Sequence, residues 1–227
     1  MGGRTLTLIL KLHGDEPELR HLRHACEALN NEKIVLVPTE TGYCLVGDPN
    51  SARVFKHFLD LRQAHPRQKP FSVLCSNISQ VTQVAAFDTT VFRIAKRILP
   101  GPYTFILHGH RDTPKHAGSS KTKSVGVRIS SHPAAAKLCA EFGHPLLITS
   151  VTDTEELQSE HYYDSRDNSD AWWASGERIV EHFKNKIDVA FCGPEPIPMR
   201  SSTVVDFTQN PAAVVRDGGW PLEELGL

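Results

Sequence analysis

The sequence predicts an α/β domain in which helices cover a twisted, mixed β-sheet. Apolar runs of strand length alternate with amphipathic stretches of helical period along most of the chain, and this order is typical of the class. The chain has 227 residues, of which 40% are hydrophobic, so it is long enough to bury a sizeable core. No internal repeat, low-complexity tract or clean boundary divides it, so we expect a single domain over residues 1–227.

The first half of the chain begins with a strand at residues 6–12. A helix to about residue 29 follows, with Asp15 as its cap and Pro17 in its first turn. The β-branched run at residues 34–37 predicts a buried strand, which ends at Pro38 because proline cannot donate to a sheet ladder. The next expected elements are a strand at 44–47, a helix from 51 to 61, a strand at 71–75, helices at 78–87 and 91–99, and a strand at 103–107.

The second half continues the alternation. Residues 108–123 are polar and rich in Gly and Ser, which predicts a mobile loop, with a lid over a bound nucleotide as the alternative. Residues 153–175 are acidic and polar apart from four aromatic residues. We expect an excursion there, chiefly at residues 160–175, whose rings either tuck against the body or form a partner surface. The other expected elements are strands at 125–129, 146–148, 187–191, 204–207 and 214–216, and helices at 133–143 and 177–185.

Bulk properties exclude several classes of function. The formal net charge of −1 gives no global attraction to nucleic acid, so a site for a polyanion must come from local clustering. Five scattered cysteines without a C-x-x-C pair favour reduced core thiols in a soluble, cytoplasmic protein. The apolar segment at residues 5–12 is too short to span a bilayer, so we expect no membrane partner. His21 and His24 are one helical turn apart, but nothing supplies further ligands, so no metal site is assigned.

Three places suggest ligand chemistry on physical grounds. Two hydroxyls and a carboxylate, at residues 39–41, follow the strand at 34–37, and open α/β sheets place ligands beyond the carboxyl ends of strands. A turn whose hydroxyls satisfy local backbone groups is the alternative. Arg128 stands among apolar strand residues, where a charge must pair or meet an anion. Residues 62–70 form a basic, proline-containing loop, which is either a solvated loop or a clamp for a triphosphate.

These segments, in this order, resemble the YrdC-like family of threonylcarbamoyl-adenylate synthases from about residue 34 to residue 217. The segments concerned are Val-Pro-Thr-Glu-Thr-Gly-Tyr at 37–43, Pro-Gly-Pro-Tyr-Thr at 100–104, Val-Gly-Val-Arg at 125–128, Thr-Ser at 149–150, Ser-Thr-Val-Val-Asp at 202–206 and Val-Arg at 215–216. The resemblance implies a YrdC-like fold with a concave basic ligand surface. It also implies a nucleotidyltransferase that makes threonylcarbamoyl-AMP and pyrophosphate from L-threonine, bicarbonate and ATP, for the N6-threonylcarbamoyladenosine modification of tRNA. Mg²⁺ is expected to accompany the triphosphate.

The resemblance further implies which residues form the site. Substrate contacts fall on Thr39, Thr104 and Arg128. Nucleotide contacts fall on Arg62, His65, Arg67, Ser150, Thr152, Ser202 and Arg216. No catalytic acid or base is assigned, because a carbamate is already nucleophilic and the chemistry depends on alignment and charge neutralisation. We expect one cavity to be lined by Thr39, Thr104, Arg128, Ser150, Ser202 and Arg216.

Two departures from the family pattern favour its YciO-like branch and predict slow turnover. His65 stands where the family has an arginine, and a neutral imidazole is a poor counter-charge for phosphate. Thr152 replaces an asparagine, so one hydroxyl on a shorter arm takes the place of a planar amide. The alternative function is that of a YciO-like protein that binds nucleotide, tRNA or double-stranded RNA without synthase activity. The near-neutral charge and the lack of an aromatic stacking motif argue against RNA.

Overall fold

A large mixed sheet runs through the molecule, in agreement with the α/β fold expected from the sequence. This computed structural model describes residues 6–62, 70–151, 172–183 and 186–226. Among the described residues, eleven strands form the main sheet, in the order β1-β10-β2-β3-β8-β4-β7-β6-β12-β13 with β5 beside β6, and β9 pairs with β11 in a second sheet. The strands are β1 (Leu8–Lys11), β2 (Val35–Thr39), β3 (Gly42–Gly47), β4 (Ser72–Leu74), β5 (Ala85–Ala86), β6 (Tyr103–Gly109), β7 (Ser124–Arg128), β8 (Leu146–Ser150), β9 (Trp172–Ala174), β10 (Val189–Cys192), β11 (Ile197–Met199), β12 (Thr203–Asp206) and β13 (Ala213–Arg216).

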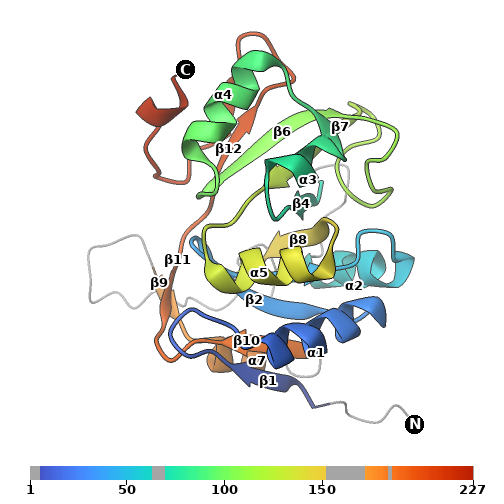
Figure 1. Cartoon of the computed structure of the whole chain (residues 1–227), viewed down its shortest axis with the longest axis vertical. Coiled ribbons are helices and arrows are strands. Elements are labelled where there is room, and N and C mark those ends of the chain that lie inside the picture. Colours follow the sequence, from blue (N-terminus) through green and yellow to red (C-terminus); the bar gives the residue numbers. More distant parts are fainter. Residues whose placement is uncertain (1–5, 63–69, 152–171, 184–185, 227) are drawn as a thin grey trace.

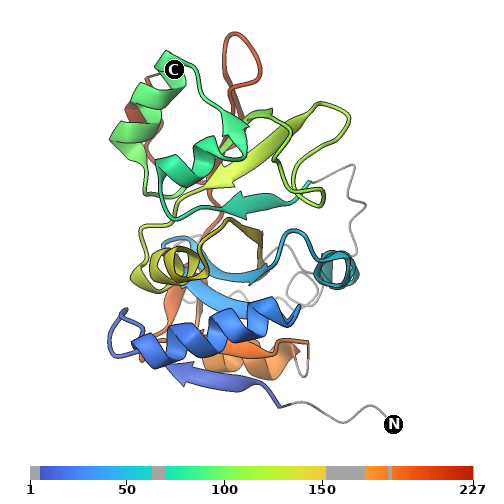
Figure 2. The ribbon, with the colours of Figure 1, turned by 45° about the vertical axis from the view of Figure 1, so that its right-hand side comes forward.

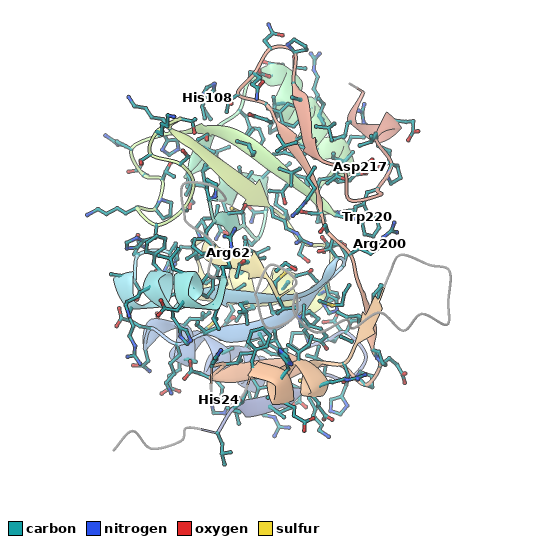
Figure 3. All side chains as sticks on the ribbon, turned by 180° about the vertical axis from the view of Figure 1, so that it is seen from behind. His24, Arg62, His108, Arg200, Asp217 and Trp220 are labelled. Atoms are coloured by element: carbon teal, nitrogen blue, oxygen red, sulfur yellow. The ribbon has the colours of Figure 1, made fainter. Side chains whose placement is uncertain are left out.

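Helices cover both faces of the sheet. Figure 1 shows α1 and α5 in front of the lower strands, and Figure 3, seen from behind, shows α2 and α7 on the opposite face. α1 and α5 contribute to one hydrophobic cluster, and α2 and α7 contribute to the other, together with α3 and α4. The helices are α1 (Leu19–Asn30), α2 (Ala52–Arg62), α3 (Ile78–Thr82), α4 (Thr89–Ile98), α5 (Pro133–Phe142) and α7 (Gly176–Phe183), and a 3-10 turn, η2 (Glu223–Leu225), lies near the C-terminus.

Local sequence explains where two of these helices begin and end. The carboxylate of Asp88 accepts a hydrogen bond from the backbone N–H of Val91 at 2.8 Å, which caps α4. Pro133 occupies the first turn of α5, where the missing N–H has no partner to lose. Gly143 ends α5 at φ = 87°, a left-handed conformation that glycine adopts without steric cost.

The strand directions alternate in a way that brings distant segments together. β1, β10 and β2 are parallel, β2, β3, β8 and β4 are antiparallel to their neighbours, and β7 is parallel to β4. β6 pairs antiparallel with β7 and parallel with β12. Figures 1 and 2 both show these strands following one another along the long axis, with α4, β6 and β12 at one end and β1 at the other.

Four expectations about the first half of the chain are wrong in detail. The strand expected to end at Pro38 continues to Thr39, because Pro38 pairs with Tyr43 in the antiparallel ladder between β2 and β3. Asp15 does not cap the first helix, because α1 begins at Leu19, and the Asp15 carboxylate instead lies 3.5 Å from Nε2 of His132. The helix expected at 78–87 ends at Thr82, and residues 85–86 form β5, since pairing with β6 satisfies their backbone groups. The strand expected at 44–47 begins at residue 42, because it forms a hairpin with β2.

The second half differs at the expected excursion. Residues 172–174, near the end of the expected excursion, form β9, whose backbone groups pair antiparallel with those of β11. The remainder of the excursion expected at 160–175 lies outside the described residues. Cys26 is half-buried, and Cys44, Cys75, Cys139 and Cys192 are buried. Among the helices described, none is both long and apolar enough to cross a membrane.

Candidate functional site

A cavity of about 430 Å³ lies over one face of the main sheet, from β3 to β13. Its floor follows the register of the strands. Ser72 of β4 lies opposite both Ile148 and Gly126, and Val204 of β12 lies opposite both Thr104 and Arg216. Residues two apart on a strand share a face, so the row continues from strand to strand. The row comprises Cys44, Ser150, Ile148, Ser72, Gly126, Ile106, Thr104, Val204 and Arg216.

Arg128, at the end of β7, is the most enclosed charge of the cavity. Its side chain is only 6% exposed, and Nη2 donates to Oε1 of Glu40 at 2.8 Å. The same nitrogen donates to the hydroxyls of Thr39 and Thr41 at the turn between β2 and β3. The sequence predicted that Arg128 would either pair with a charged group or meet an anion. The structure confirms the first of these, and the partner is Glu40.

Glu40 is held as a carboxylate by several donors. Its Oε2 accepts hydrogen bonds from the hydroxyl of Ser130 and, at 3.1 Å, from the backbone N–H of Ser131. Burial alone would raise the pKa of the Glu40 carboxyl. The charge of Arg128 and the hydrogen bonds from Ser130 and Arg128 outweigh burial, so this pKa lies below its ordinary value. The pair therefore stays ionised at neutral pH and fixes the Arg128 guanidinium beside the cavity.

A second polar network lies at the β12 side of the cavity. Arg216 donates from Nε to the carbonyl of Ser202 at 3.0 Å and from Nη2 to its hydroxyl at 2.9 Å. The hydroxyls of Ser202 and Thr104 are 2.9 Å apart. The guanidinium is thus oriented by two donated bonds, and the two hydroxyls are linked directly beneath the cavity.

Two further arginines complete the basic lining. Arg62, the last residue of α2, is buried, and its guanidinium carbon lies 4.4 Å from the ring centroid of Phe71. Arg200 is exposed and lies over the ring of Trp220 at 5.0 Å. Figure 3 shows Arg62 near the centre of the molecule, and Arg200 beside Trp220.

The electrostatic character of the cavity favours an anion. Four arginines line it, whereas its lining, as far as the structure describes it, contains no Asp or Glu. Two buried polar atoms of the lining, Nε of Arg128 and Oγ1 of Thr149, have no hydrogen-bond partner among the described residues. Buried polar atoms are normally satisfied, so these two are suited to meet a ligand or water. The arrangement can bind phosphate or carboxylate oxygens through charge-assisted hydrogen bonds.

The structure brings most of the expected site residues to this cavity. Thr104, Arg128, Ser150, Ser202, Arg216 and Arg62 all line it. Thr39 is not in the lining, contrary to expectation: it is buried behind Arg128, and its hydroxyl donates to the carbonyl of Gly42 at 2.6 Å. Its hydroxyl serves the hairpin turn, the alternative that sequence reasoning had left open. His65, Arg67 and Thr152 lie outside the described residues.

Sequence reasoning did not assign four residues that the structure places at or beside the cavity. Thr41 and Thr149 line it, and each stands next to, or two positions from, an expected site residue. The sequence shows Glu40 as a carboxylate in the threonine-rich turn, but it does not indicate that Arg128 is its partner. Arg200 had a weaker signal, namely a basic residue directly before a run of serine and threonine.

The described residues include no group of three His, Cys, Asp or Glu side chains that could hold a metal ion. His21 and His24 accordingly form no such group within the described part of the chain. The cavity's donors are guanidinium and hydroxyl groups, which suit anionic ligands rather than a directly bound cation.

Comparisons with known proteins agree on the relationship. The Sua5/YciO/YrdC family model, which carries the description "Telomere recombination", matches residues 27–218. The chain is 28% identical over 210 residues to the uncharacterized protein YciO of Escherichia coli K12, covering 91% of this chain and 93% of that protein. It is 33% identical over 137 residues to threonylcarbamoyl-AMP synthase of Yersinia enterocolitica, covering 57% of this chain and 69% of that protein.

Solved structures lead to the same relationship. The crystal structure of E. coli YciO matches with a TM-score of 0.83 at 25% identity, covering 97% of this chain and all of that one. The structure of P. abyssi Sua5 complexed with L-threonine matches with a TM-score of 0.77 at 25% identity, covering 97% of this chain and 60% of that one. Together with the family match over most of the sequence, these similarities show that the chain belongs to the Sua5/YciO/YrdC family.

Proposed function

We propose that the cavity binds L-threonine and ATP, and that the protein is a nucleotidyltransferase that makes threonylcarbamoyl-AMP at a reduced rate. One observation carries the proposal: Arg62, Arg128, Arg200 and Arg216 line a single cavity with serine and threonine hydroxyls. Membership of a family that includes threonylcarbamoyl-AMP synthases supports it, as does the Sua5 structure with bound L-threonine. A volume of about 430 Å³ is of the size of small-molecule sites.

The two polar networks suggest how the ligands are oriented. Arg128 lies at the turn between β2 and β3, and we assign the amino-acid end of the ligand to this side. Arg62 and Arg216 lie at α2 and β13, and we assign the nucleotide phosphates to them. Arginine suits both tasks because its planar fork donates two parallel bonds to a carboxylate or a phosphate.

The reaction needs alignment more than acid–base chemistry. The threonine amine and bicarbonate first give a carbamate with loss of water. A carbamate oxygen then attacks the α-phosphorus of ATP, the bond from this phosphorus to the bridging oxygen breaks, and pyrophosphate leaves. In this step the arginines neutralise the phosphate charge. The hydroxyls of Thr104 and Ser202, which line the cavity, orient the adenylate within it. The adenylate product would serve the N6-threonylcarbamoyladenosine modification of tRNA.

A Mg²⁺ ion would accompany ATP rather than occupy a protein site. Mg²⁺ retains much of its water and commonly binds phosphate oxygens. The guanidinium and hydroxyl groups of the cavity would also donate hydrogen bonds to phosphate oxygens. This set of donors therefore fits a Mg²⁺–ATP complex. When bound, the ion would help to neutralise the triphosphate.

The test is a pair of titrations on the intact chain, in which the protein is titrated with ATP and Mg²⁺ and, separately, with tRNA and double-stranded RNA. The proposal expects saturable nucleotide binding that RNA does not displace, together with threonine binding in the same preparation. Tight RNA binding without nucleotide binding would contradict it and favour a binding role. Product analysis then separates threonylcarbamoyl-AMP synthesis from adenylate formation on another amine or carboxylate.

A further inference from the structure

The segment after β13 leads from the edge of the cavity to α4. We call residues 217–226 the C-terminal strap. Leu225 is fully buried in the core, and the phenolic hydroxyl of Tyr103 donates to the carbonyl of Pro221 at 2.8 Å. These contacts fix the far end of the strap on the body of the protein, beside α4 (Figure 1). The near end of the strap, at Gly219 and Trp220, contacts the loop before β12.

The near end of the strap holds the loop that carries Arg200. Trp220 donates from Nε1 to the carbonyl of Ser201 at 2.9 Å, and its ring lies 5.0 Å from the guanidinium carbon of Arg200. Nη2 of Arg200 donates to the carbonyl of Gly219 at 3.3 Å. Gly219 has φ = 73°, and a Cβ there would lie 2.6 Å from that same nitrogen, so a glycine permits the close approach. Figure 3 shows Arg200 and Trp220 side by side.

These contacts matter because Arg200 is an exposed side chain at the lining of the cavity. A free arginine loses much rotamer freedom when it binds a ligand, and a side chain that is already oriented loses less. Within the described part of the chain, no carboxylate forms an ion pair with Arg200. The backbone N–H of Arg200 also donates to the carbonyl of Thr41 at 2.8 Å, which ties the loop to the turn beside Arg128.

We propose that Arg200 binds an oxyanion of the ligand and that Trp220 is a positioning residue that holds Arg200 toward the cavity. The oxyanion is either a phosphate of the nucleotide or the carboxylate of the amino acid, since both present the same chemistry to a guanidinium. The inference rests on the proposed function, because it takes the ligands of the cavity to be ATP and threonine.

The experiment is calorimetric titration of the full chain with ATP and Mg²⁺ and, separately, with L-threonine. Arg200→Ala should weaken one of the two affinities about ten-fold, the loss expected for one charge-assisted bond at an exposed site. A loss confined to ATP identifies the phosphate as the partner, and a loss confined to threonine identifies the carboxylate. Arg93→Ala, which removes an exposed arginine of α4 outside the cavity lining, should leave both affinities unchanged.

A double-mutant cycle tests the role of Trp220. Trp220→Leu should weaken the same affinity roughly three-fold or more in the wild-type background and not at all in the Arg200→Ala background, because its effect passes through Arg200. Trp220→Phe keeps a ring under the guanidinium and should retain most of the affinity. This variant also tests the positioning role if Trp220→Leu folds poorly.

The outcomes separate the inference from the proposed function. If the wild type binds neither ATP nor threonine, the proposed function fails and the inference fails with it. If the wild type binds both ligands and Arg200→Ala changes neither affinity, the inference is overturned while the proposed function stands. If Trp220→Leu costs the same in both backgrounds, its effect does not pass through Arg200 and the positioning role is overturned.

Discussion

Removing the carboxylate of Glu40 should destabilise the protein, because it leaves the Arg128 guanidinium buried without its counter-charge. The two groups are 2.8 Å apart, and the Arg128 side chain is only 6% exposed. At an effective dielectric constant of 20, two unit charges at this separation attract by on the order of 6 kcal/mol. The cost of desolvating both groups offsets much of that attraction in the native pair.

The net loss in a variant is therefore smaller than the Coulomb attraction. Removing one partner of a buried pair typically costs about 3–5 kcal/mol. Thr39 and Thr41 still accept bonds from Arg128, so we expect Glu40→Ala to lie near the lower end, at about 3 kcal/mol of unfolding free energy. Replacing both charges, as in Glu40→Ala with Arg128→Met, should restore part of this loss because no charge remains buried.

Urea denaturation at pH 7 measures these differences. Glu27→Ala provides the matched control, because Glu27 is an exposed glutamate of α1 and its loss should change stability by no more than about 0.5 kcal/mol. If Glu40→Ala costs no more than this control, or if the double variant is less stable than Glu40→Ala, the guanidinium does not depend on Glu40 and the reasoning is refuted.

The same pair predicts a dependence of stability on pH. The folded-state pKa of Glu40 is lowered from its ordinary value of 4.5, so the unfolded chain binds the proton more readily. Its contribution to stability is therefore fully present above about pH 4.5 and is lost as the pH falls through the lower, folded-state pKa. Between pH 5 and pH 3 the wild type should lose stability more steeply than Glu40→Gln. Parallel curves for the two proteins would contradict the assignment.

Three further predictions concern ligand binding and turnover. Arg216→Ala should weaken ATP binding about ten- to hundred-fold, as judged by calorimetry, because it removes a charge-assisted contact. An unchanged affinity would contradict the assignment of the nucleotide phosphates to Arg216. Gly126→Ala should cost about 1–3 kcal/mol in urea denaturation and weaken ligand binding, since a Cβ would lie 2.3 Å from the hydroxyl oxygen of Ser72; unchanged stability and affinity would show that the floor tolerates extra volume. His65→Arg with Thr152→Asn should raise the single-turnover rate of adenylate formation more than it raises ATP affinity; a brisk wild type with no faster double variant would show that these departures do not limit the chemistry.

Much of the fold was predictable from the sequence because its elements are periodic or strongly apolar. The run at residues 34–37 became part of β2, and the amphipathic stretch at residues 91–99 became most of α4. The short strands β5 and β9 were not predictable, since two or three residues carry no periodicity and their pairing with β6 and β11 is a tertiary contact.

The candidate site was predictable only in part. A charge within an apolar strand indicated that Arg128 would find a partner, but no spacing identifies Glu40, which lies 88 positions away in the sequence. Arg62, Ser150 and Ser202 share no local pattern, and it was their order in a family resemblance that grouped them. Arg200 and its loop contact the C-terminal strap, a separate segment of the chain, and no local pattern indicates such a tertiary contact.

The most direct test of the proposed function is product analysis after a single turnover with labelled L-threonine, bicarbonate and Mg²⁺–ATP. We expect threonylcarbamoyl-AMP and an equal amount of pyrophosphate, formed slowly and only when threonine and bicarbonate are both present. Omitting either one should abolish both products. If the protein binds ATP but forms no threonylcarbamoyl-AMP under any of these conditions, or forms pyrophosphate without threonine, the cavity does not perform this reaction.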